Sequence, residues 1–198
     1  LNSGKSTEEI FSKLHVSLKR VIPFDGMVLT LLNDTNTFLN IENIVFNQSL
    51  FYTLLRKGDR FFISELSIKQ LIDGEIDLLN VEDLGLYLNN NKMHDVFNEI
   101  NRNGIHSILA VSLVMKNQIR GIIFFLSGYK SFFKNHHITF VRSIVGQIAL
   151  SVQRAELMKE IENHSKNLEK MVSQRTEEVL KTQRATIFAL SSLADARD

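Results

Sequence analysis

The sequence contains no cysteine and no tryptophan among its 198 residues. Without cysteine the chain cannot form disulfides, thiolate metal sites, a cysteine nucleophile or a thioether link to a chromophore. A cysteine-free chain is typical of a reducing compartment, so we predict a cytoplasmic location for this segment.

Long hydrophobic runs and an excess of one charge are also missing. The longest apolar runs, such as SILAVSLVM and GIIFFL, are far shorter than the roughly 18 residues that a membrane helix needs. No signal-peptide pattern opens the chain. The 23 Lys and Arg residues nearly balance the 22 Asp and Glu residues, whereas binding of a nucleic-acid duplex requires a concentrated basic face. We therefore predict neither membrane contact nor a duplex partner.

Proline occurs once, at Pro23, and predicts the end of an N-terminal helix. Ser6 and Glu9 have the spacing of a capping box, and apolar side chains follow on one helical face. Gly4-Lys5-Ser6 invites comparison with a phosphate loop, but the chain holds no glycine upstream of it. We interpret this region as a structural helix.

Strand patterns follow this helix. The run MVLTLL is largely apolar on both faces, which is typical of a central strand. In the next strand we expect Leu39, Ile41 and Val45 on one face and Asn40 and Glu42 on the other. This alternation predicts a half-buried strand.

Turn signals divide the rest of this region. We expect a short helix, SLFYTLLRKG, that ends at Gly58, then a short strand in RFFISEL, and helical patches at IKQLIDGEIDLL and MHDVFNEI within residues 67–103. Asn103-Gly104 marks a turn. The runs IHSILAVSLVM and QIRGIIFFLSG predict two strands joined tightly at Lys116-Asn117, because Asn tolerates positive φ.

Glycine and proline are absent from Gln147 to Asp198, which predicts one continuous helix. Glu162 with Lys166, and Glu177 with Lys181, have favourable i,i+4 spacing. A heptad frame places Met158, Ser165, Val172 and Val179 at position a and Ile161, Leu168, Arg175 and Thr182 at position d. The apolar members predict a parallel homodimer interface made of Met158, Ile161, Leu168, Val172 and Val179.

The order of the predicted elements resembles that of GAF sensory domains over about residues 7–157. The likeness is carried by SLFYTLLRKGDRFFISEL and by GIHSILAVSLVMKNQIRGIIFFLSGYKSFFKNHHITFVRSIVGQIALSVQRAEL. It implies an α+β fold with an antiparallel sheet of about five to six strands and helices on its faces. It also implies a ligand pocket between the sheet and residues 67–103, for which Phe62, His94 and Ser107 are the candidate residues.

The sequence departs from the ligand-binding members of this family. Ser127, Lys130 and Phe133 fall near the first positions of the motif of cyclic-nucleotide-binding GAF domains, but His137-Ile138 replaces its acidic pair. Bilin-attaching and sulfoxide-reducing members need cysteine. The alternatives that stay open are a small nucleotide, haem held by one of the six histidines, and a domain without a ligand.

The end of the chain resembles two parts of signalling proteins. LEKMVSQRTEEVLKTQ is similar to helices that link sensors to outputs, and ALSSLADARD resembles the entry helix of HD-GYP phosphodiesterases, which hydrolyse cyclic di-GMP with bound metal ions. Asp195 and Asp198 suit a helix C-terminus poorly, so we expect the helix to continue into a missing output domain. We predict a GAF-like domain in residues 1–152, a coiled-coil signalling helix in 153–185 and a truncated entry helix in 186–198. A different output, such as a histidine kinase, is the alternative.

No motif in the chain predicts catalysis. His94-Asp95 matches the first two residues of a metal phosphohydrolase motif, but Val96-Phe97 stands where that motif continues with Gly and Lys. His136-His137 are adjacent, so on a helix they cannot share an ion as an i,i+4 pair does; we interpret them as a polar helix start. We therefore expect no catalytic residue, metal or resident cofactor in this chain, and metal ions only in the output domain.

Overall fold

The computed structural model describes residues 7–47, 54–91 and 95–195. The chain divides into two compact units, Leu1–Ala155 and Glu156–Asp198, and each is described by itself.

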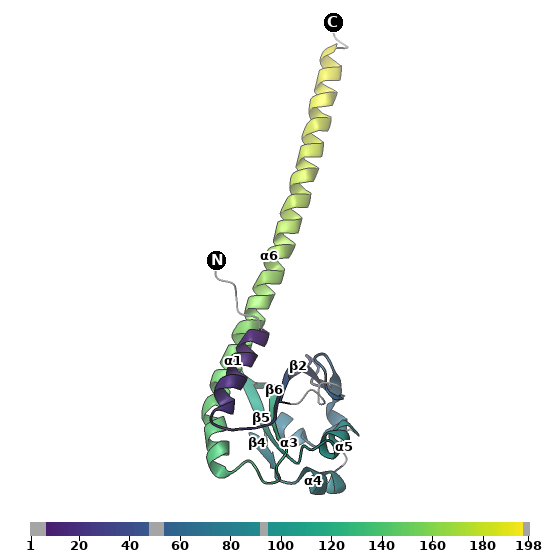
Figure 1. The fold of residues 1–198 in the computed structure, drawn as a ribbon. Helices are drawn as coiled ribbons and strands as arrows, with labels where there is room; N and C mark the ends of the chain where they lie inside the picture. Colours follow the sequence, from purple (N-terminus) through teal and green to yellow (C-terminus); the bar gives the residue numbers. More distant parts are fainter. Residues whose placement is uncertain (1–6, 48–53, 92–94, 196–198) are drawn as a thin grey trace. The chain divides into compact units, whose positions relative to one another are not determined.

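Six strands of the described residues form one antiparallel sheet in the order β3-β2-β1-β6-β5-β4 (Figure 1). The strands are β1 (Gly26–Leu32), β2 (Phe38–Phe46), β3 (Arg60–Phe62), β4 (Leu78–Val81), β5 (Ser107–Met115) and β6 (Gln118–Ser127). This arrangement confirms the predicted α+β class and the antiparallel sheet of about five to six strands.

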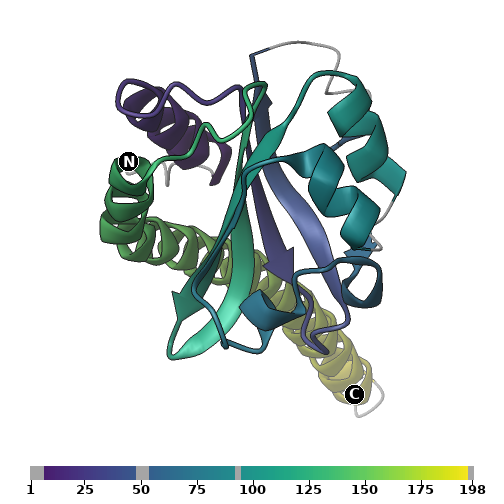
Figure 2. The same cartoon turned by 90° about the horizontal axis from the view of Figure 1, so that it is seen from below.

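Helices cover both faces of the sheet. They are α1 (Thr7–Lys19), α3 (Lys69–Ile72), α4 (Leu84–Asn90), α5 (Asp95–Arg102) and α6 (Asn135–Asp195). Figure 2 shows α1 and the first part of α6 on one face, with the helices between β3 and β5 on the other. The N-terminal helix is confirmed, whereas Ser6 of the predicted capping box lies outside the described residues.

Each face of the sheet carries its own apolar core. The face under α1 and α6 buries Phe24, Met27, Phe125, Val141 and Ile148. The opposite face buries Ile41, Leu71, Leu84, Ile100 and Ile122. Because β1 contributes to both cores and lies between β2 and β6, its apolar sequence on both faces follows from its central position. Complete burial of one such side chain contributes about 1.5–3 kcal/mol to folding.

A β-bulge corrects the predicted face of Val45. Leu29 pairs with Asn43 and Thr30 pairs with Ile41, so Glu42 is an extra residue in β2. The insertion reverses the alternation, and Val45 packs with the core under α1 and α6 instead of sharing a face with Ile41. The prediction for Val45 is therefore wrong, because it assumed an unbroken ladder.

A glycine with positive φ and a tight turn interrupt the regular structure of the first unit. Gly58 has φ of 92°. Residues 49–53 of the helix predicted before it lie outside the described residues, and the prediction that the helix reaches Gly58 is wrong, because residues 55–58 are not helical. Lys116 and Asn117 adopt positive φ values of 51° and 61°, which confirms the tight turn between β5 and β6.

Two predicted elements are shorter than expected. The helical patch IKQLIDGEIDLL is helical only in α3, because Gly74 turns the chain with φ of 76° and Leu78 and Leu79 then pair with β5 as part of β4. The strand in RFFISEL ends at Phe62, and a short 3-10 helix, η1 (Ile63–Glu65), follows. The helix predicted at MHDVFNEI is present as α5.

The long C-terminal helix is confirmed as α6, with 61 residues. In the second unit, every side chain of α6 that the structure describes is exposed. The predicted i,i+4 pairs are present, with Lys166 Nζ 3.9 Å from Glu162 Oε1 and Lys181 Nζ 2.8 Å from Glu177 Oε1. Among the described helices, none combines the length and the apolar content that crossing a bilayer requires.

Candidate functional site

A small cavity lies between the sheet and α5. Its volume is about 30 Å³, and its lining includes Val28, Ile41, Phe61, Phe97, Phe124 and Leu126. Sites that bind small molecules usually have volumes of about 300–1,000 Å³. In this structure the cavity is therefore too small for a nucleotide or haem.

The lining of the cavity offers no obvious group for polar recognition. Thr30 is the only residue with a polar side chain among the described lining residues, and its Oγ1 donates a hydrogen bond to the carbonyl oxygen of Ile122 at 2.8 Å. The lining therefore lacks the two to four polar partners that a buried water usually has. A charged ligand would thus require new polar groups to enter the site.

Neither of the two candidate pocket residues that the structure describes lines this cavity. Phe62 is 55% exposed and makes an edge contact with Phe38, while its neighbour Phe61 lines the cavity. Ser107 shares its strand face with Leu109, in the core under α1 and α6, and its Oγ donates to the carbonyl oxygen of Tyr129 at 2.7 Å. His94 lies outside the described residues.

Sequence reasoning missed the residues that do line the cavity from α5 and β6. Phe97 and Ile100 face the sheet from α5, and Phe124 comes from β6. The alternation in β6 could have predicted that Phe124 faces the cavity side of the sheet. Ile122 and Leu126 flank Phe124 at a spacing of two residues and pack on the same face.

The described histidines make their contacts elsewhere in the chain. Among the described histidines, none lines the cavity. His106 Nδ1 is 3.1 Å from Asn101 Oδ1, and the rings of His136 and His137 lie 4.0 Å apart near the start of α6. Burial, followed by the neighbouring His136, lowers the pKa of His137. Within the described parts of the chain, no three His, Asp or Glu side chains gather as a metal site would require.

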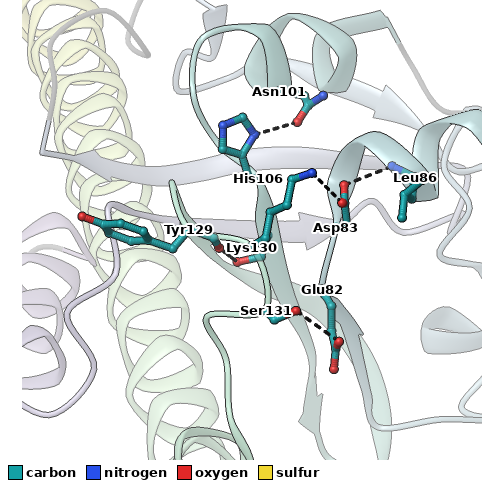
Figure 3. Close-up of polar contacts among 9 residues, drawn as sticks. Glu82, Asp83, Leu86, Asn101, His106, Tyr129, Lys130 and Ser131 are labelled. Atoms are coloured by element: carbon teal, nitrogen blue, oxygen red, sulfur yellow. Dashed lines mark hydrogen bonds and ion pairs between the residues drawn. The ribbon is translucent and has the colours of Figure 1, made fainter.

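Asp83 connects the start of α4 to the loop that precedes α6 (Figure 3). Its side chain accepts a hydrogen bond from the backbone N–H of Leu86 at 3.1 Å and thereby caps α4. Lys130 Nζ lies 2.8 Å from Asp83 Oδ2. The hydrogen bond from Lys130, followed by the one from Leu86, lowers the pKa of the Asp83 carboxyl.

Further polar contacts join the same two regions. The backbone N–H of Ser131 donates to the carbonyl oxygen of Glu82 at 2.7 Å, and the Ser131 hydroxyl lies 3.3 Å from Glu82 Oε2 (Figure 3). Asn80 Nδ2 donates to the carbonyl oxygen of Phe133 at 3.3 Å. Residues on and after β4 thus hold the loop from which α6 starts.

A bidentate ion pair connects the other end of β4 directly to α6. Arg142 Nε and Nη2 donate to the two carboxylate oxygens of Asp77 at 2.8 and 2.9 Å. The hydrogen bond from Arg142 is the largest cause of the lowered pKa of Asp77. We call the contacts of Asp77, Asn80, Glu82 and Asp83 with α6 and its preceding loop the β4 links.

The predicted interface residues of the second unit are all exposed. Met158, Ile161, Leu168, Val172 and Val179 each leave about half or more of their side-chain surface open to solvent. Arg175, at a predicted d position, has Nη1 3.9 Å from Glu178 Oε2. Homodimer formation through this face stays a prediction.

A family model for the GAF domain matches residues 6–152 of the chain. Among solved structures, the GAF domain/HD domain protein from Geobacter sulfurreducens is similar, with a TM-score of 0.63, 15% identity and coverage of 76% of this chain and 94% of that one. The GAF domain of a two-component sensor histidine kinase from Bacillus halodurans has a TM-score of 0.62, 17% identity and coverage of 76% and 96%. The GAF domain of a phosphoenolpyruvate-protein phosphotransferase from Coxiella burnetii has a TM-score of 0.60, 17% identity and coverage of 80% and 89%.

These structural likenesses, at such low identity, establish a shared fold. No curated protein sequence matches the chain closely enough to count as a relative. The family model, however, spans well over half of the sequence and includes the whole sheet. The chain therefore belongs to the GAF domain family, whose members act as sensory or regulatory domains in signalling proteins.

Proposed function

We propose that this GAF domain controls a C-terminal HD-GYP domain that hydrolyses cyclic di-GMP, and that a parallel pair of α6 helices carries the signal. The observation that carries the proposal is the double role of α6. Val141, Ile148 and Val152 of this helix are buried in the core of the first unit. The same helix continues beyond Ala155 with exposed side chains. A change in the domain that moves the start of α6 would therefore move its continuation.

The β4 links support this proposal because they connect the cavity side of the domain to α6. The strand β4 lies between α3 and α4 in the chain, and both helices belong to the segment that packs on the cavity face. Asp77 contacts α6 itself through Arg142, while Asp83 contacts the preceding loop through Lys130. A displacement of the cavity-side helices would then shift the base of α6, as small movements at one site are amplified by packed elements.

The identity of a signal molecule is a separate part of the proposal. The closed cavity favours either a ligand-free structural GAF domain or a ligand whose entry displaces α5. Calorimetry and absorbance spectroscopy of the purified chain against cyclic nucleotides, cyclic di-GMP and haem would distinguish these alternatives. Binding of any of them would support the ligand-binding alternative; no response across the panel would favour the ligand-free domain. We propose no resident cofactor or metal for this chain.

The output assignment is tested by the codons that follow Asp198. A sequence rich in His and Asp metal ligands, and hydrolysis of cyclic di-GMP by the extended protein, is the expected result. A histidine kinase or another domain in that place would disprove the HD-GYP output while leaving the sensory role intact. The chain is similar in structure to GAF domains from both an HD domain protein and a histidine kinase, so the fold alone does not distinguish these two outputs. The sequence after Asp198 would distinguish them.

A further inference from the structure

The apolar side chains of the second unit repeat with a spacing that differs from the heptad frame. Leu157, Ile161, Leu168, Val172 and Val179 are separated alternately by four and seven residues, so the pattern recurs every eleven residues. We call these five residues the eleven-residue stripe. Their side chains are 42–64% exposed. Met158, Met171, Leu180 and Ile187 are exposed as well, but they point in other directions around the helix.

The geometry of a straight helix explains why this spacing matters. Successive residues turn by about 100° around a helix of 3.6 residues per turn, so the five members of the stripe fall within a sector of about 60°. Met158, which the heptad frame includes, lies outside that sector because it directly follows Leu157. An eleven-residue repeat corresponds to about 3.67 residues per turn and produces a nearly straight or slightly right-handed pair, whereas a heptad repeat produces a left-handed one.

The charges of this unit favour a second copy of the chain as the partner. Residues 156–184 contain six acidic and six basic side chains, so the segment has no net charge that would select an acidic or a basic partner. Many of these charges are already paired within the helix, including Glu162 with Lys166 and Glu177 with Lys181. Arg175, whose direction falls within the stripe, reaches Glu178 of its own helix. Two identical helices can therefore approach without strong net repulsion.

We propose that two copies of the chain pair in parallel through the eleven-residue stripe, with Leu157 in the interface and Met158 at its edge. In this register each apolar layer meets its own counterpart, so the repeated spacing is matched along the whole contact. The proposal rests on the proposed function, which requires a helix dimer, and adds which face of the helix pairs and how the pair winds.

Cysteine cross-linking tests this register directly, because the chain contains no natural cysteine. Four single variants of the full chain form two matched pairs, each with one position inside the sector of the stripe and one outside it: Leu157→Cys with Met158→Cys, and Leu168→Cys with Ser165→Cys. All four positions are exposed, so the substitutions do not disturb a core. We expect disulfide-linked dimers to form several-fold faster at positions 157 and 168 than at 158 and 165 under mild oxidation.

The other outcomes separate this inference from the proposed dimer. Faster cross-linking at 158 than at 157, together with equal rates at 165 and 168, would overturn the stripe in favour of the heptad frame, with the dimer intact. Equal rates at all four positions would overturn any fixed register. Sedimentation of the unsubstituted chain as a monomer, with no cross-linking at any position, would overturn both the dimer and the stripe.

Discussion

At the scale of single residues, a half-buried histidine makes the stability of the domain depend on pH. His15 Nε2 is buried without a hydrogen-bond partner among the described residues. Burial, and then the charge of Lys19, lowers the pKa of His15 below 6.5. The neutral imidazole is therefore favoured in the folded state, so its stabilising effect is complete above about pH 6.5 and is lost as the pH falls through the lowered pKa.

Substitutions of His15 separate the effect of its titration on stability from the effect of burying a polar atom. We expect His15→Leu to remove this contribution to acid sensitivity and to raise the free energy of unfolding at pH 7 by up to about 1 kcal/mol, since a buried polar atom without a partner is lost. His15→Gln is the matched control, because it removes the titration but keeps a polar side chain. Urea unfolding between pH 5 and pH 8 measures both effects, and an unchanged pH slope in both variants would contradict the assignment.

The Asp83 carboxyl provides a second prediction at this scale. Lys130→Met removes the largest cause of its lowered pKa, so that pKa should rise toward its ordinary value while the N–H of Leu86 still lowers it in part. Titration of the carboxyl by carbon NMR measures the change. Lys69→Met, which removes a lysine paired with Asp73, is the control and should leave the Asp83 titration unchanged. An Asp83 pKa unaffected by Lys130→Met would show that the ion pair does not persist in solution.

At the scale of elements, Gly121 permits the close approach of β6 to β1. A Cβ atom at this position would lie 2.1 Å from the carbonyl oxygen of Thr30 and 2.9 Å from Leu31 Cδ2. Both strands are central, so neither can move away freely. We expect Gly121→Ala to destabilise the domain by about 1–3 kcal/mol or more, measured by chemical unfolding.

Gly146 in α6 is the matched control for Gly121. A Cβ atom there meets nothing within 4 Å. Alanine favours a helix over glycine by about 0.5–1 kcal/mol, so Gly146→Ala should stabilise the domain. If both alanine variants were equally stable, the close contact between β6 and β1 would be absent in solution.

The sequence predicted those elements whose signal is local. The apolar runs of β5 and β6 and the turn at Asn117 were predicted because both strands are buried and the turn needs positive φ. The short strand β4 was missed because only pairing with β5 makes it a strand. The cavity residue Phe97 was missed because its position depends on how α5 packs on the sheet, which no local pattern contains.

At the scale of the whole molecule, the proposed dimer depends on the apolar face of the second unit. Ile161 and Leu168 belong to both the heptad frame and the eleven-residue stripe, so replacement of both by Asp should produce monomers, because each change would bury a charge in an apolar contact. Analytical ultracentrifugation at micromolar concentration measures the result. Asn163→Asp with Asn167→Asp adds the same two charges outside the stripe and should leave the dimer intact.

A double variant at Ile161 and Leu168 that sediments like the parent would place the principal interface elsewhere.

Arg175→Leu tests the same face by a change that should strengthen the contact. It replaces a charged group within the face by an apolar one, so it should tighten the dimer. In an extended protein with its output domain, a tighter pair should also respond less to signals, since one arrangement of the helices would be favoured over others.

The extra residue in β2 also has a consequence for comparing this chain with distant relatives. Glu42 lies between two stretches of β2 that each alternate regularly between the two faces of the sheet. Its insertion shifts the second stretch by one residue relative to the first. Removing Glu42 alone would give one continuous alternation in which Ile41 and Ile44 keep their present faces. In an alignment with a relative that lacks the bulge, the gap therefore belongs at Glu42, inside a strand. An alignment that allowed gaps only in loops would pair residues of one face of the sheet with residues of the other face along half of β2.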